Sequence, residues 1–282
     1  MAKYPRAKQL ATRVAMMPRD TNGHGHIFGG VILSYIDIAG AMVARQACGP
    51  GNIKRMVTRA MSQIEFRKPV LVNDILTCYG RITRVGKTSV NVHVDVEVDR
   101  NGKTIRVTKA DLTFVSVDEN DRPIPIACAP QSRRKKSTAA EPPPEVPIGE
   151  RVLAVRKAMF PNETNGMGNI FGGILLSYMD LAGSFVAKRA CANGFIDRCV
   201  TRFMDRVEFK QPVKVNDVIS CYGSVIAIGE TSIKVHVEVE ADRGGQIIPV
   251  TSADLVFVAV DEQGNPTGVR CCTSSPSTKC GA

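Results

Sequence analysis

A single carboxylate stands inside a long apolar stretch of this sequence. Asp37 lies within the segment from Gly30 to Cys48, which is rich in Ala, Ile, Leu, Val and Met and contains no proline. Such a segment is typical of a helix that is buried on all sides. Burial makes a carboxylate costly to ionise and raises its pKa, which suits general-base chemistry near neutral pH. A structural ion pair or hydrogen bond is the alternative role for this side chain.

Two consecutive glycines, Gly29 and Gly30, stand where this helix is expected to begin. The first turn of a helix has N–H groups without intrahelical acceptors and carries a partial positive charge. Because glycine has no side chain, a ligand oxygen can approach these N–H groups closely. The pair therefore indicates a site that stabilises negative charge developing on an oxygen atom.

The same arrangement occurs twice. The run from Ile27 to Asp37 returns as Ile170 to Asp180, and the offset of 143 residues holds without a gap from Met16 to Asp118, with more than half of the aligned positions identical. Two copies at this spacing are two domains rather than repeats of a solenoid. The candidate catalytic and oxyanion residues of the two copies are Asn22, Gly29, Gly30 and Asp37, and Asn165, Gly172, Gly173 and Asp180.

The sequence divides into two domains, a linker and a tail. We expect the first domain in residues 1–130, a linker in 131–150, the second domain in 151–269 and a flexible tail in 270–282. The linker carries the basic run Arg133 to Lys136, followed by consecutive prolines that keep a chain extended.

Each copy shows one helix among several strands. Alternating valines from Thr88 to Val98 indicate a strand with one buried face, and Asn101-Gly102 is a hairpin turn signal. The order β-α-β-β-β-β predicts one buried helix wrapped by an antiparallel meander. The elements expected in the first copy are strand 10–17, helix 30–48 and strands 57–66, 75–85, 88–98 and 105–117.

Composition places the chain among ordinary globular proteins. Of its 282 residues 44% are hydrophobic and 23% charged, and the apolar runs are too short to span a bilayer. The N-terminus lacks the apolar segment of a secretory signal, and nine cysteines without a CxxC spacing fit a reducing compartment. We therefore expect a cytoplasmic protein without membrane insertion. The net charge of +10 favours anionic partners, but no Trp and no nucleic-acid motif are present, so we expect no nucleic-acid partner.

The run from Thr21 to Gly30, which leads into the helix carrying Asp37, together with the element order, resembles the hotdog fold. More narrowly, it resembles the hotdog acyl-CoA thioesterases, both the bacterial short-chain acyl-CoA hydrolases and the two-domain brain-type enzyme. Their signature is an Asn, a glycine turn, a Gly-Gly pair at the helix start and an acidic residue within the helix. The resemblance covers both copies and implies an α+β tandem double hotdog, each domain an antiparallel sheet wrapped around one long helix.

The resemblance also implies an activity, which is the hydrolysis of acyl-CoA thioesters to free acid and CoA at composite sites between two hotdog domains. Asn22 and Asp37, and Asn165 and Asp180, match the functional positions, with the Asp acting as general base or nucleophile. The brain-type enzyme has one degraded site, whereas both copies here keep both residues. No cofactor is implied, because coenzyme A is part of the substrate. Double-hotdog units of this family often assemble further, so we expect a homo-oligomer, typically a trimer.

Helix geometry predicts how the two copies share their residues. Asp37 lies about 10 Å along the helix from Gly30, because an α-helix rises about 1.5 Å per residue. A carbonyl held at one helix start is therefore too far from the Asp of that helix. If the copies pack about a pseudo-twofold axis, Gly30 and Asn22 pair with Asp180, and their counterparts pair with Asp37.

Further residues have two possible roles. Arg59 and Arg202 would suit CoA phosphates, or would form ion pairs with Glu65 or Glu208. Two Thr-Ser pairs would contact pantetheine, or would simply form turns; they are Thr88 and Ser89, and Thr231 and Ser232.

A metal site and covalent catalysis are both disfavoured. His24 and His26 have the spacing of a metal pair, but Met167 and Asn169 replace them in the second copy, so we expect no metal. The GxSxG motif is absent. A hotdog hydratase would need a His near both helix starts. A non-catalytic acyl-CoA sensor or scaffold remains the alternative function.

Overall fold

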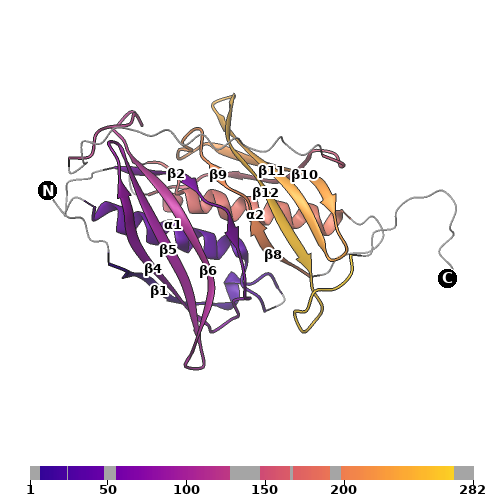
Figure 1. Ribbon diagram of the computed structural model, residues 1–282. Helices are drawn as coiled ribbons and strands as arrows, with labels where there is room; N and C mark the ends of the chain where they lie inside the picture. Colours follow the sequence, from indigo (N-terminus) through magenta and orange to yellow (C-terminus); the bar gives the residue numbers. More distant parts are fainter. Residues whose placement is uncertain are drawn as a thin grey trace, which may run out of the picture.

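The computed structural model describes residues 7–23, 25–47, 55–127, 147–165, 168–190 and 198–269. The elements of the first copy are β1 (Gln9–Ala15), η1 (Pro18–Asp20), α1 (Gly29–Arg45), β2 (Met56–Met61), β3 (Ile64–Glu65), β4 (Ile75–Val85), β5 (Ser89–Arg100) and β6 (Lys103–Ser116). Those of the second are β7 (Val152–Ala158), η2 (Pro161–Glu163), α2 (Gly172–Arg189), β8 (Cys199–Met204), β9 (Val207–Glu208), β10 (Val218–Ile228), β11 (Ser232–Arg243) and β12 (Gln246–Ala259). Two antiparallel sheets, each with one long helix, form the predicted α+β double hotdog (Figure 1).

The predicted boundaries between domains are only partly described. Residues 131–146 of the predicted linker, the preceding residues 128–130 and the tail from residue 270 onward lie outside the described residues, as do His24 and Met167. The end of the linker joins the second sheet, because the N–H groups of Ile148 and Gly149 both donate to the carbonyl of Val225. The division into 1–130, 131–150, 151–269 and 270–282 stays a prediction.

The strand order differs from a simple meander. The sheets run β1-β4-β5-β6-β2-β9 and β3-β8-β12-β11-β10-β7, so β2 lies beside β6 rather than β4. Side-chain alternation identifies a strand but does not name its neighbours, which is why the sequence did not reveal this order.

The predicted strand 57–66 is in fact two strands in two sheets. β2 stays in the first sheet, whereas β3 pairs with β8 of the second copy, Ile64 opposite Met204. In return, β9 of the second copy pairs with β2. Each sheet therefore contains one short strand from the other copy, which joins the two domains along their backbones.

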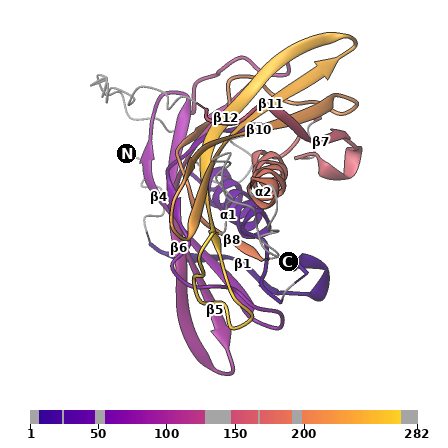
Figure 2. The same cartoon turned by 90° about the vertical axis from the view of Figure 1, so that its right-hand side faces the viewer.

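The two helices lie next to each other at the centre of the molecule, and strands of both sheets flank them (Figure 2). Their approach is close enough to require glycine. A Cβ atom added to Gly30 would lie 2.7 Å from the Cα of Ser177, and one added to Gly173 would lie 2.7 Å from the Cα of Ser34. Ser34 itself donates its hydroxyl to the carbonyl of Val31 in its own helix, so it permits close packing rather than supporting a carboxylate.

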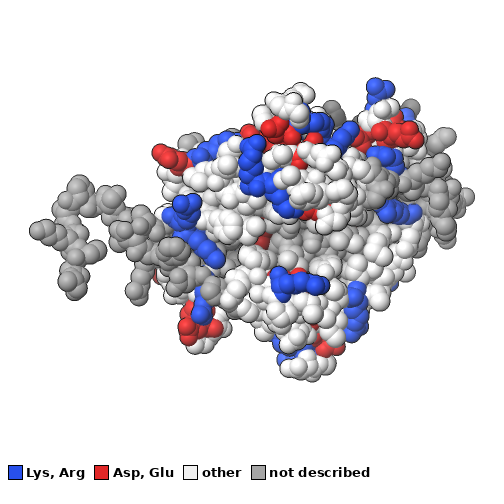
Figure 3. Space-filling view, turned by 180° about the vertical axis from the view of Figure 1, so that it is seen from behind, with Lys and Arg blue, Asp and Glu red and all other residues white. Residues whose placement is uncertain are grey.

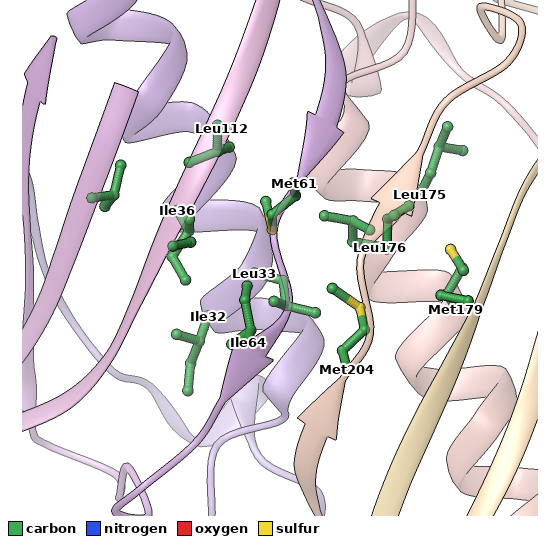
Figure 4. Packing of buried hydrophobic residues seen from close by; sticks show 14 of the residues in the cluster. Ile32, Leu33, Ile36, Met61, Ile64, Leu112, Leu175, Leu176, Met179 and Met204 are labelled. Carbon is green, nitrogen blue, oxygen red and sulfur yellow. The ribbon is translucent and has the colours of Figure 1, made fainter. Parts of the chain in front are cut away.

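The hydrophobic core continues from one copy to the other. Leu33, Met61 and Ile64 of the first copy pack near Leu176 and Met204 of the second, and all five side chains are fully buried (Figure 4). Each fully buried aliphatic side chain stabilises the fold by roughly 2 kcal/mol. This shared core fixes the pseudo-twofold arrangement and therefore the position of each helix start against the other helix.

No helix in the described ranges is both long and apolar enough to cross a membrane. On the face of the molecule turned away from the viewer in Figure 1, Lys and Arg alternate with Asp and Glu, and the middle of the face is mainly uncharged (Figure 3). The positive net charge is thus not gathered into one continuous basic surface on this face.

Replacing Gly173 by Ala should destabilise the protein. The added methyl group meets backbone of the opposite helix, which cannot move aside, so the helices must separate at a cost of about 1–3 kcal/mol. Gly149→Ala is the matched control, because its Cβ would find ordinary contacts of 3.5 Å or more. Chemical denaturation measures both variants; equal unfolding free energies for the two would contradict this account of the helix contact.

Candidate active site

Each buried Asp contacts the start of the other copy's helix. Asp180 Oδ2 accepts a hydrogen bond from the N–H of Gly30 at 2.7 Å, and Asp37 Oδ2 accepts one from the N–H of Gly173 at 2.8 Å. The structure thus brings together the residue pairs that helix geometry predicted, one from each copy. Both carboxylates have no exposed surface.

The second oxygen of each carboxylate is held by a threonine that the sequence analysis did not single out. Thr201 donates its hydroxyl to Asp180 Oδ1 at 2.6 Å, and Thr58 donates to Asp37 Oδ1 at 2.7 Å. Each threonine lies on the first strand after the helix of its own copy. The recurrence of Val-Thr-Arg at the same offset in both copies was the available signal.

Burial decides the protonation of these two groups. Loss of hydration raises the pKa of Asp37 and of Asp180 from 3.8 to about 6, and the hydrogen bonds from threonine and glycine only partly oppose this shift. Both carboxylates are therefore mostly ionised at pH 7 but remain basic enough to take a proton from water.

The two glycines at each helix start have different environments. The N–H of Gly30 is engaged by Asp180, whereas the N–H of Gly29 has no hydrogen-bond acceptor among the described residues. The same holds for Gly173 and Gly172. A Cβ atom on Gly29 would lie 2.8 Å from the Cβ of Thr201, so the close approach of Thr201 requires glycine at this position.

The candidate asparagines lie in the turns that precede the helices. The N–H of Asn22 donates to the carbonyl of His26, and the N–H of Asn165 donates to the carbonyl of Asn169, both at 2.8 Å. Asn165 lines one cavity together with Gly172 and Thr58. This turn therefore brings a residue of the second copy to the same cavity as Thr58 of the first.

Two cavities lie at pseudo-equivalent positions between the copies. A cavity of ≈ 300 Å³ is bordered by Gly29, Phe66 and Thr201, and one of ≈ 40 Å³ by Gly172, Phe209 and Thr58. Both have residues of both copies in their walls. A ligand at either helix start would therefore contact both halves of the chain.

The six candidate substrate-binding residues differ in whether they line one of these cavities. Arg202 and Thr231 line the larger cavity. Arg202 also forms an ion pair with Glu65 of the other copy at 2.7 Å, so the ion-pair alternative applies to it. The other four residues line neither of these two cavities, and they are Arg59, Thr88, Ser89 and Ser232. The carbonyl of Thr88 accepts from Ser116 N–H and that of Ser89 from Gly86 N–H, as expected of turn residues.

The chain belongs to the thioesterase superfamily, whose sequence profile matches residues 24–105 and 167–248, one match in each copy. An acyl-CoA thioester hydrolase of Haemophilus influenzae is 40% identical over 118 residues, which are 40% of this chain and 74% of that protein. Acyl-CoA thioester hydrolase YciA of Salmonella typhimurium is 34% identical over 123 residues, which are 42% of this chain and 90% of that protein.

A solved structure resembles both copies together. The acyl-ACP thioesterase of Bacteroides thetaiotaomicron aligns with 87% of this chain and 96% of its own, with a TM-score of 0.56 and 13% sequence identity. At this identity the likeness establishes the fold alone, which is the double hotdog.

Removing a buried carboxylate should stabilise the protein at neutral pH. Because the folded-state pKa of about 6 lies above 3.8, the folded protein retains a proton that the unfolded chain has lost between these values. Each Asp therefore lowers stability as pH rises from 4 to 6. We expect Asp37→Asn or Asp180→Asn to raise the unfolding free energy at pH 7 by on the order of 2 kcal/mol, and hardly at pH 4.

Chemical denaturation at the two pH values measures this difference. Glu119→Gln, which changes an exposed carboxylate, is the control and should alter neither value. A wild-type protein that is more stable than Asp37→Asn at pH 7 would show that burial of this charge does not oppose folding.

Proposed function

We propose that the protein hydrolyses acyl-CoA thioesters at two composite sites between its hotdog domains. The observation that supports this most strongly is the crossed contact of each buried Asp with the helix start of the other copy. Membership of the thioesterase superfamily and relatives named acyl-CoA thioester hydrolases agree with it. The products are the free acid and CoA.

The thioester oxygen binds at the first N–H of a helix in this proposal. The N–H of Gly29 or Gly172 donates to the carbonyl oxygen and stabilises the negative charge that develops as the carbonyl carbon is attacked. A preorganised donor of this kind commonly lowers a barrier by about 3 kcal/mol. The N–H groups of Gly30 and Gly173 instead hold the carboxylates in position.

The carboxylate of the opposite copy activates the attack. Asp180 takes a proton from a water molecule as its oxygen adds to a thioester held at Gly29, and Asp37 does the same at Gly172. The C–S bond of the tetrahedral intermediate then breaks, and the proton passes from the carboxyl group to the leaving CoA thiolate, which leaves the free acid and restores the carboxylate. Direct attack by the carboxylate is the variant of this step, in which the C–S bond breaks to give an anhydride that water hydrolyses. Asn22 and Asn165 orient the water or the thioester. Thr201 and Thr58 are positioning residues, since each holds one carboxylate oxygen and leaves the other beside the glycines.

The assembly and location of the protein are further parts of the proposal. One chain supplies both halves of each site, so the double hotdog is the catalytic unit. The homo-oligomer, with a trimer as its expected form, and the cytoplasmic location stay predictions, which sedimentation and fractionation would test.

Turnover should depend on both carboxylates, and each should act independently. An assay of CoA release should find measurable activity in Asp37→Asn and in Asp180→Asn, because each variant keeps one intact site. The double variant should lose about 10³-fold in kcat, the usual contribution of a general base. Ser34→Ala, on the same helix face but bonded to its own helix, is the control. Complete loss of turnover in either single variant would refute two independent sites.

The pH dependence of turnover should report the buried carboxylates. Because the base must be ionised, kcat/KM should rise with pH and level off above an apparent pKa of about 6. The threonine hydroxyl stabilises the charged form, so replacing it raises the pKa. Thr201→Val in the Asp37→Asn background should therefore move the acid limb to higher pH. An unchanged limb would show that the threonine does not act through the carboxylate.

A further inference from the structure

The two composite sites are unequal in size, although their walls are built from corresponding residues. Ile27, Gly29 and Phe66 of the larger cavity correspond to Ile170, Gly172 and Phe209 of the smaller one. Yet the cavities measure ≈ 300 and ≈ 40 Å³. The smaller cavity therefore offers a thioester and its pantetheine arm much less room than the larger one.

The two sites also differ in the turn that follows the last strand of each copy. Gly264, in the turn after β12, lines the larger cavity, and a Cβ atom on it would lie 3.3 Å from the ring of His26. At the corresponding positions of the smaller site, Asp121 replaces Gly264 and Asn169 replaces His26. Asn169 donates its side-chain N–H to Asp121 Oδ1 at 2.6 Å.

Two cations complete this contact at the smaller site. Arg55 lies 3.6 Å from Asp121 Oδ1, and Lys214 lies 3.4 Å from Asp121 Oδ2. The Asp121 side chain is only 12% exposed, so its ion pairs are less screened by water than those of a surface carboxylate. We call this cluster of Asp121, Arg55, Asn169 and Lys214 the Asp121 latch.

In the part of the chain that the structure describes, the larger site has no carboxylate in the place of Asp121. Leu71 stands in the place of Lys214, and Arg198, which corresponds to Arg55, pairs with exposed Glu262 at 3.4 Å. Asn169 is 3% exposed, whereas His26 is only partly buried. The latch thus joins a turn of the first copy to the wall of the second copy at one of the two sites.

We propose that Asp121 determines access to the Asp37 site, so that the Asp180 site carries most of the turnover. This inference rests on the proposed thioester hydrolysis. The latch holds the Asn169 wall against the turn that carries Asp121, and substrate reaches Gly172 only when these contacts break. The site beside Gly29 requires no such opening, since glycine leaves that turn without a side chain.

Single-site variants test this proposal directly. Asp37→Asn leaves the open site and Asp180→Asn leaves the latched site, and we expect kcat/KM for CoA release to differ by at least about tenfold in favour of the former. Adding Asp121→Gly should raise kcat/KM of the Asp180→Asn variant about fivefold or more and leave that of Asp37→Asn unchanged. Glycine suits this position, because Asp121 has a φ of 61° and Gly264 has a φ of 81°.

A reciprocal variant tests the same proposal by adding the latch to the larger site instead of removing it from the smaller one. His26→Asn, Leu71→Lys and Gly264→Asp together rebuild the latch at the open site and should lower kcat/KM of the Asp37→Asn variant. Equal activities of the two single-site variants, or no gain from Asp121→Gly in the Asp180→Asn background, would overturn the latch. Full activity in the double variant Asp37→Asn/Asp180→Asn would instead overturn the proposed catalysis, and the latch with it.

Discussion

A hydrogen bond between a buried carboxylate and the first turn of the opposite helix links the two halves of this molecule. The contact has a donor, Gly30 or Gly173, that also lies against the backbone of the opposite helix. A larger side chain there would separate the helices and carry the carboxylate away from the neighbouring free N–H. Close packing of the helices and the position of the carboxylate therefore both require glycine at the helix start, which explains why two glycines begin each helix.

The burial of these carboxylates opposes folding, and the rest of the structure must offset it. Two acids without exposed surface carry pKa values raised by desolvation, and among the described residues each accepts hydrogen bonds from a glycine N–H and a threonine hydroxyl alone. The continuous core across the copies and the exchanged strands β3 and β9 supply the compensating stability. A carboxylate whose pKa is raised at a cost in stability is typical of a functional site, where its basicity is used.

Much of the fold and of the candidate site could be predicted from the sequence, because the duplication shows each motif twice. The repeat located both domains, the apolar helix identified its single Asp, and the rise of an α-helix per residue implied that each Asp approaches the helix start of the other copy. The strand order and the division of 57–66 into β2 and β3 were not predictable, because pairing partners depend on the packing of the two copies together. Thr58 and Thr201 were missed because threonine is common in strands and nothing in a pattern shows where its hydroxyl points.

The repeat in the sequence also did not predict that the two cavities differ in volume. Asp121 and Gly264 are both ordinary turn residues, and their significance comes from partners in the other copy that a single strand pattern does not reveal. The two halves thus share one arrangement of Asp, Thr and Gly while differing in the residues around it. Gene duplication within one chain permits this divergence, which a symmetric homodimer cannot show.

The central claim is that one half binds the thioester oxygen while the other half supplies the carboxylate. A crystal structure with a hydrolysis-resistant acyl-CoA analogue tests it most directly. The account predicts the carbonyl oxygen within about 3 Å of the Gly29 N–H, with the carbonyl carbon facing Asp180. A carbonyl bound beside Asp37 at the middle of its own helix, or outside the contact between the two copies, would contradict it.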